Sequence, residues 1–189
     1  AYFLKTTGKT MVPRFYNRLD MNTTGLIIVT KNAYSQAYLQ EKTEVRKSYQ
    51  TIVKGIVEQD EFYITKPIGK VGEDLRRIEL AVSEGGQEAK TFVKVLKRFP
   101  ERNRTLLDVT LFTGRTHQIR VHMAHIHHAV VNDPLYGWKK DHFPIEGQAL
   151  HSHTLDLKHP VTGESMHFEA PVPDDMLQCL DLARKGTPI

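Results

Sequence analysis

Apolar runs separated by short polar turns fill the middle and the end of the chain. Four runs rich in Val, Ile, Leu, Thr and Phe read as strands, at residues 48–57, 75–82, 89–99 and 104–112. The turns between them are Glu58-Gln59-Asp60, Glu84-Gly85-Gly86 and Glu101-Arg102-Asn103. Two more strands, 149–157 and 165–169, flank the turn Pro160-Val161-Thr162-Gly163. We therefore predict antiparallel hairpins.

Helical spacing appears at three places between and after these strands. Asn32 can cap a helix that runs to about Glu41 and follows a short buried strand at 26–30. Residues 116–127 carry apolar side chains at helical spacing, namely Ile119, Met123 and Ile126. Asp174 or Asp175 can cap a final helix with Met176, Leu177, Leu180 and Ala183. The pattern predicts an α+β domain over 1–189, with a mostly antiparallel mixed β-sheet flanked by helices.

Composition narrows the class of protein without naming a function. The 26 Lys and Arg outnumber the 22 Asp and Glu, and the net charge of +4 with a pI near 9.1 makes an anionic partner plausible. The single Cys179 excludes an internal disulfide framework. Since no apolar run approaches the ~20 residues that span a bilayer, we expect no membrane partner and take the cytoplasm as the default location.

Asp20 is the first candidate for chemistry. It stands in Asn17-Arg18-Leu19-Asp20-Met21-Asn22-Thr23-Thr24-Gly25-Leu26 and leads into the apolar run Leu26-Ile27-Ile28-Val29. Local pattern alone favours a structural role, because Asp side chains commonly accept hydrogen bonds from backbone N–H groups of a following turn. A second segment, Thr113-Gly114-Arg115-Thr116-His117-Gln118-Ile119-Arg120-Val121-His122, places guanidinium and polar groups at the start of a predicted helix.

Together these segments resemble motifs of the RluA family of RNA pseudouridine synthases. Arg46-Lys47-Ser48-Tyr49-Gln50-Thr51-Ile52-Val53-Lys54-Gly55 lies between them, and Asp133-Pro134-Leu135-Tyr136-Gly137 and His159-Pro160-Val161-Thr162-Gly163-Glu164 follow, in the family's order. The resemblance runs from about Phe15 to about Pro173 and is more specific than any single motif. It implies isomerisation of specific uridines to pseudouridine in structured RNA, in ribosomal RNA first and transfer RNA second, with no metal or organic cofactor.

The resemblance also assigns catalytic roles. Asp20 would be the catalytic carboxylate, and Arg115 the cation that keeps it ionised in a pocket largely closed to water. Whether the carboxylate attacks C6 of the base, attacks C1′ of the sugar or removes a proton from C2′ stays open. Tyr49 reads by pattern as core filling in a strand. By resemblance it would stack on the target uracil and could handle the proton that leaves C5.

Substrate-binding roles follow from the need to extrude a uridine from folded RNA. Arg18 would act as wedge or phosphate clamp, with pairing to a local carboxylate as the alternative. Ile119 would form an apolar wall beneath the base, a role compatible with ordinary helix packing. A basic surface for phosphates would include Lys47 and Arg120, together with Arg46, Lys139 and Lys140, although each alone could be a solvated charge.

Three positions depart from the family pattern. Asn17 stands where the family usually has His, Thr24 where Ser is common, and Asn132 where Gly is frequent. Asn17 and Thr24 keep hydrogen-bonding capacity, so we expect activity to survive.

The ten histidines raise a metal hypothesis, since His122, His125, His127 and His128 lie within seven residues. No Cys pair or carboxylate stands at ligand spacing, so we predict no metal. We expect His117 and His122 to make polar contacts around the helix start and the sheet.

The start of the chain is also unusual for the family. Members usually carry, before the Asp motif, a strand pair, an Asn-Lys-Pro segment and often a small S4-type RNA-binding domain. This chain begins at Ala1, which by pattern lies inside the helix before the catalytic loop. We therefore expect a fragment that lacks these parts. As a separate default we expect a monomer. Three hypotheses result: a pseudouridine synthase that uses Asp20, a catalytically silent RNA-binding remnant of the same fold, and an unrelated metal-dependent hydrolase.

Overall fold

A computed structural model describes Gly8, residues 12–137 and residues 143–185. Its centre is a seven-stranded sheet in the order β11-β10-β4-β9-β8-β5, with β2 beside β10. The strands are β2 (Thr24–Gly25), β4 (Arg46–Lys54), β5 (Glu61–Ile64), β8 (Thr91–Phe99), β9 (Arg104–Leu111), β10 (Leu150–Lys158) and β11 (Ser165–Glu169). Every pairing is antiparallel except β2 with β10, which is parallel. The predicted α+β class and mostly antiparallel mixed sheet are confirmed.

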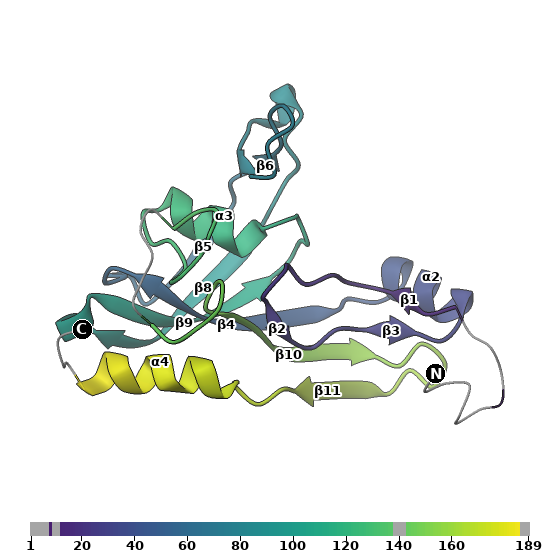
Figure 1. The fold of residues 1–189 in the computed structure, drawn as a ribbon. Helices are drawn as coiled ribbons and strands as arrows, with labels where there is room; N and C mark the ends of the chain where they lie inside the picture. The colour runs from purple at the N-terminus through teal and green to yellow at the C-terminus, as the bar shows by residue number, and fades with distance from the viewer. Residues whose placement is uncertain (1–7, 9–11, 138–142, 186–189) are drawn as a thin grey trace.

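The core lies against the long central strands. Tyr49 pairs with Val109 and Thr51 with Leu107, so these four side chains stand on one face of the β4–β9 ladder. Two helices contribute to the same core, α3 (Gln118–His125) through Ile119 and Met123, and α4 (Asp174–Lys185) through Met176, Cys179, Leu180 and Ala183. In Figure 1 α3 lies against the part of the sheet that contains β5 and β8. Ile119, in the first turn of α3, belongs to the same core cluster as Tyr49.

Most predicted elements are confirmed within a few residues. The α2 helix (Ala33–Glu41) begins after Asn32, whose Oδ1 accepts a hydrogen bond from the backbone N of Ser35 at 2.8 Å. α4 presents the predicted apolar residues to the core except Leu177, which is 45% exposed. α3 begins at Gln118 rather than 116, because His117 has a left-handed backbone with φ 58°.

The predicted strand at 75–82 is reduced to β7 (Ile78–Glu79). β7 pairs only with β6 (Ile68–Gly69), and together they form an arm that stands out from the body of the molecule (Figure 1). Ile78 is 45% exposed, so the apolar residues of this segment lack a sheet to cover them. The sequence pattern did not predict β1 (Arg14–Phe15), β2, β5 or β6. The short 3₁₀ turns η1 (Val82–Glu84) and η2 (Pro100–Arg102) overlap the turns predicted at 84–86 and 101–103.

The buried strand predicted at 26–30 is wrong in extent and burial. Only β3 (Val29–Thr30) is a strand, and it pairs with β1 (Arg14–Phe15) in a separate two-stranded sheet. Ile27 is 42% exposed. The backbone N of Leu26 still donates to the backbone oxygen of Ser152 in β10 at 3.0 Å, after which the chain leaves the large sheet to reach β1. Some expectations concern residues outside the described ranges. These are the part of the basic surface at Lys139 and Lys140 and the helix expected at the start of the chain.

Candidate active site

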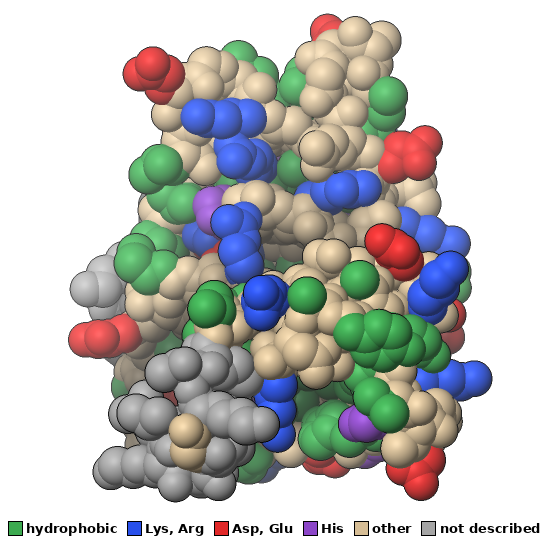
Figure 2. Space-filling model, turned by 90° about the vertical axis from the view of Figure 1, so that its right-hand side faces the viewer, with side chains coloured by type: hydrophobic (Ala, Val, Ile, Leu, Met, Phe, Trp, Pro, Cys, Tyr) green, Lys and Arg blue, Asp and Glu red, His purple; other side chains and the backbone are tan. Residues whose placement is uncertain are grey.

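A cleft of about 680 Å³ lies between the segment 15–20, the start of α3 and the strand β4. All seven residues predicted for the site line it: Arg18, Asp20, Lys47, Tyr49, Arg115, Ile119 and Arg120. Figure 2 shows one face of the molecule, where Lys and Arg side chains surround a hollow and most Asp and Glu side chains lie toward the outline. Residues far apart in sequence, such as Asp20 and Arg120 at 100 positions, are therefore brought together around one space.

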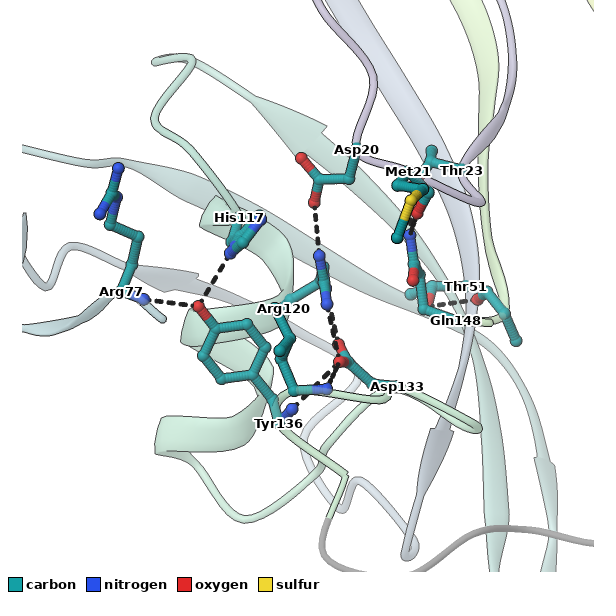
Figure 3. Close-up of polar contacts among 12 residues, drawn as sticks. Asp20, Met21, Thr23, Thr51, Arg77, His117, Arg120, Asp133, Tyr136 and Gln148 are labelled. Carbon is teal, nitrogen blue, oxygen red and sulfur yellow. Dashed lines mark hydrogen bonds and ion pairs between the residues drawn. The ribbon is translucent and has the colours of Figure 1, made fainter. Parts of the chain in front are cut away.

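The loop that carries Asp20 is fixed by the start of β10 and the residues before it. The side-chain amide of Gln148 donates to the backbone oxygen of Met21 at 2.6 Å and to Oγ1 of Thr23 at 2.8 Å (Figure 3). Within the loop, the backbone N of Thr23 donates to the backbone oxygen of Asp20 at 3.0 Å. Gln148 is 1% exposed, so these bonds are shielded from water and hold the backbone that follows Asp20.

Asp20 forms its ion pair with Arg120, not with Arg115 as predicted. Nη1 of Arg120 donates to Oδ2 of Asp20 at 3.1 Å (Figure 3). Arg115 instead donates from Nε to the backbone oxygen of Glu88 at 2.9 Å, and its backbone N donates to Gln118 Oε1 at 2.9 Å. Arg115 precedes the left-handed residue His117 and bonds to the chain just before β8, whereas Arg120 lies within α3 and reaches the Asp20 loop. Arg115 still lines the cleft and stays available to a ligand.

A second carboxylate holds Arg120 in place. Asp133, whose side chain is 0% exposed, accepts from Nε of Arg120 at 2.7 Å and from Nη2 at 2.8 Å. Its Oδ1 also accepts from the backbone N of Leu135 and of Tyr136, at 2.9 and 3.0 Å. Although burial opposes its charge, the hydrogen bonds to Asp133 and Asp20 raise the pKa of the Arg120 guanidinium. Arg120 is therefore a fixed cation with one N–H aimed at Asp20.

Tyr49 and Ile119 form the buried wall of the cleft. Tyr49 is 6% exposed and Ile119 is 3% exposed, and both belong to the main core as well as to the cleft lining. Burial raises the pKa of the Tyr49 phenol, a hydrogen bond with the Ser152 side chain partly opposes this, and the negative charge of Asp20 raises the pKa further. The phenol is therefore protonated at neutral pH and can act as a hydrogen-bond donor beside Asp20.

Two cations stand at the rim. Nζ of Lys47 lies 5.9 Å from the ring centroid of Tyr16, and burial lowers the pKa of this lysine. Arg18 is exposed, and within the described part of the chain it forms no ion pair. Whether Arg18 serves as a wedge or clamp or pairs with a local carboxylate stays a prediction, and its exposed side chain lines the cleft.

Sequence reasoning gave no site role to Asp133, Tyr136 or Gln148. Asp133 and Tyr136 belong to the motif Asp133-Pro134-Leu135-Tyr136-Gly137, and this motif was the signal that could have identified them. The lone Gln148 offered none, because its partner Thr23 is 125 residues away in sequence. His117 makes the polar contact expected of it, since its Nδ1 lies 3.0 Å from the hydroxyl of Tyr136.

The three departures from the family pattern are accommodated locally. Oδ1 of Asn17 accepts from the backbone N of Ile28 at 2.9 Å, and Oγ1 of Thr24 lies 2.8 Å from Nδ1 of His151. Asn132 has φ 56°, a left-handed conformation that suits Gly and is tolerated by Asn. Its Nδ2 donates to the backbone oxygen of Ile145 at 2.9 Å, which helps to hold that turn.

The histidines after the start of α3 face separate partners. Nδ1 of His122 lies 2.8 Å from Oγ1 of Thr91, and its Nε2 lies 2.9 Å from the backbone oxygen of Lys66. His125 pairs with Glu79 at 2.7 Å. In the ranges described, no three His, Cys, Asp or Glu side chains gather as a metal site, and no helix there is long and apolar enough to cross a membrane.

Comparison with known proteins gives the same family as the motifs that line the cleft. Residues 3–125 match the family model described as RNA pseudouridylate synthase. A protein of Bacillus subtilis named uncharacterized RNA pseudouridine synthase YlyB is 41% identical over 180 residues, covering 93% of this chain and 57% of that protein. Ribosomal large subunit pseudouridine synthase D of Pseudomonas aeruginosa is 39% identical over 191 residues, covering 92% of this chain and 58% of that protein. The chain thus spans little more than half the length of these relatives.

A solved structure gives the same fold. The human RNA pseudouridylate synthase domain containing 1 superposes with a TM-score of 0.73 at 23% identity, covering 98% of this chain and 84% of that one. The RluA-type motifs, the fold and the sequence matches agree, and the chain belongs to the RNA pseudouridylate synthase family.

Proposed function

We propose that this chain isomerises uridine to pseudouridine in RNA, with Asp20 as the catalytic carboxylate. The observation that supports this most directly is the pairing of Asp20 with the buried Arg120 at 3.1 Å, on the wall of a cleft that also contains Tyr49. The names of the relatives add support, since they describe pseudouridine synthases and, for several, ribosomal large subunit enzymes.

The reaction breaks the C–N glycosidic bond, turns the uracil and joins it to the sugar through C5. Asp20 has to be ionised for any of the three open routes, at C6, C1′ or C2′. Nη1 of Arg120 lies 3.1 Å from Oδ2 of Asp20 and supplies a counter-charge in a site that substrate would close from water. Because Arg120 is already bound to Asp133, its position would not change when the substrate arrives, which reduces reorganisation during the reaction.

Tyr49 and Ile119 would receive the extruded base. The Tyr49 ring offers a surface for stacking. To take the proton that leaves C5, its protonated phenol would have to pass its own proton to a base, and Asp20 is the carboxylate in the same cleft lining. Ile119 gives an apolar contact from the helix side.

Arg18, Lys47 and Arg115 supply positive charge around the opening, where phosphates of the flanking nucleotides would lie. We propose ribosomal RNA as the first candidate substrate and transfer RNA as the second. Under the same proposal, the reaction takes place in the cytoplasm.

Release of tritium from RNA labelled at uracil C5 tests the proposal, because C5 loses its hydrogen when it bonds to the sugar. We expect release with the wild type on ribosomal RNA transcripts and none above background with Asp20→Asn. This change keeps the size of the side chain and removes its charge. Asp156→Asn is a matched control, since Asp156 is a half-exposed carboxylate on β10 paired with His167 at 2.6 Å and away from the cleft lining.

Binding without turnover would overturn the catalytic proposal. If folded wild type binds the transcripts and releases no tritium, the chain is the silent RNA-binding form of the fold. Equal release from wild type and Asp20→Asn would instead show that isomerisation does not use this carboxylate.

A further inference from the structure

His117 has an unusual backbone at the edge of the cleft. Its φ of 58° and ψ of 22° are left-handed, a region that non-glycine residues seldom occupy and that is often found at functional sites. Neighbouring hydrogen bonds maintain it, since the backbone oxygen of His117 accepts from the backbone N of Val121 at 2.9 Å, and the backbone N of Gln118 donates to the backbone oxygen of Arg115 at 3.1 Å. The conformation turns the imidazole toward the cleft, which His117 lines together with Asp20.

Tyr136 determines which ring nitrogen of His117 carries the proton. The Tyr136 hydroxyl oxygen accepts from the backbone N of Arg77 at 2.7 Å, and its own hydrogen is free to donate to Nδ1 of His117 at 3.0 Å (Figure 3). No other acceptor for that hydrogen occurs among the described residues. We assign Nδ1 as the acceptor because the Tyr136 oxygen already accepts from Arg77, and this assignment puts the proton of the neutral ring on Nε2.

The charges around His117 favour its neutral form. Burial lowers the pKa of the imidazole, the nearby Asp20 carboxylate partly opposes this, and the Arg120 cation lowers it again. The remaining groups that face the ring are Asp133, Arg77 and the Tyr136 hydroxyl. Nε2 makes no hydrogen bond to any residue in the described ranges, so its N–H is available to a ligand.

We propose that His117 donates a hydrogen bond from Nε2 to an uncharged oxygen of the bound nucleotide, a uracil carbonyl or a ribose hydroxyl, and that Tyr136 is the positioning residue for this donor. This inference rests on the proposed function and adds a substrate contact to it. A phosphate oxygen is the poorer partner, because the imidazole is neutral and the Asp20 carboxylate borders the same space.

Two substitutions separate substrate contact from a structural role. In His117→Asn the shorter amide reaches only the place of Nδ1, and Asn tolerates a left-handed backbone, so this variant keeps the link to Tyr136 and loses the donor in the cleft. His117→Gln can place an N–H near the position of Nε2 but fits the backbone less well. We expect tritium release by His117→Asn to fall about tenfold, the usual size of one lost hydrogen bond, and to be lower than release by His117→Gln.

A purely structural His117 would give the reverse order. Release by His117→Gln equal to or lower than that by His117→Asn overturns the proposal, as does nitrogen NMR of the free protein that finds the imidazole protonated on Nδ1. Circular dichroism melts of both variants establish that they are folded.

The same pair remains informative if the wild type releases no tritium, an outcome that overturns the proposed function alone. Affinity for a short oligouridylate is then measured by fluorescence anisotropy. Weaker binding by His117→Asn than by His117→Gln supports the contact, and equal or opposite ranking overturns it.

Discussion

Arg120 shows how much of the site depends on one buried side chain. It is 3% exposed and makes hydrogen bonds to two carboxylates, of which Asp133 is fully buried and Asp20 borders the cleft. Its guanidinium also lies 5.2 Å from the ring centroid of Tyr136. A change at Arg120 therefore affects the fold through Asp133 and, under the proposed function, the chemistry through Asp20. Arg115 has a single side-chain hydrogen bond, to a backbone oxygen.

Arg120→Met should destabilise the protein by about 3 to 5 kcal/mol, because Asp133 would remain buried without its cation. Arg115→Met is the matched control and should cost about 1 kcal/mol, the net value of one hydrogen bond. Urea unfolding followed by circular dichroism measures both. Equal losses from the two variants would contradict the role assigned to the Arg120–Asp133 pair.

At the scale of elements, the parallel contact between β2 and β10 determines where the Asp20 loop ends. Thr24 pairs with His151 and Gly25 with Ser152. Gly25 has φ 105°, and a Cβ there would meet the backbone oxygen of Ser152 at 2.1 Å. Only glycine allows this close approach, which fixes the end of the loop that begins at Asp20.

Gly25→Ala should therefore destabilise the fold by about 3 to 5 kcal/mol, from left-handed strain together with the collision against β10. Gly85→Ala is the control, since Gly85 has φ 96° and a Cβ added there would have no neighbour within 4 Å. It should cost about 1 to 2 kcal/mol from strain alone. Thermal melts compare the two variants. A loss of stability from Gly25→Ala no larger than that from Gly85→Ala would show that β10 shifts to make room for the added methyl group.

The long elements were predictable and the short ones were not. β4, β8, β9 and β10 have enough alternating or β-branched residues to be recognised, and Asn32 marks its helix with a cap. β1, β3, β6 and β7 are two residues each, which is too short for an alternating pattern to show, although their partners lie nearby in sequence. No local pattern could reveal these pairings.

The same limit explains what was missed in the site. The resemblance identified which residues meet in the cleft, but not which arginine pairs with Asp20. That pairing depends on the left-handed turn at His117, which separates Arg115 from the helix, and on Asp133, which holds Arg120 from another loop. Both are tertiary features, so spacing in the motif left the ion pair undetermined.

At the scale of the whole molecule, positive charge is gathered around the cleft. The net charge of the chain is only +4, yet Arg18, Lys47 and Arg115 all line the cleft. The only carboxylate in the same lining is Asp20, which Arg120 already pairs among the described residues. The opening therefore presents an excess of positive charge that RNA phosphates can neutralise.

Arg18→Ala should weaken RNA binding and reduce its dependence on salt, because each phosphate neutralised in single-stranded RNA contributes about 0.7 to the slope of log K against log salt. Arg184→Ala is the control, since Arg184 lies on α4, away from the cleft, and pairs with Asp181 at 3.5 Å. Anisotropy titrations at several salt concentrations measure both slopes. A slope reduced by about 0.7 for Arg18→Ala and unchanged for Arg184→Ala means that the exposed Arg18 neutralises one phosphate. Lower affinity with an unchanged slope means instead that Arg18 acts without neutralising a phosphate, as a wedge that occupies the place of the extruded base.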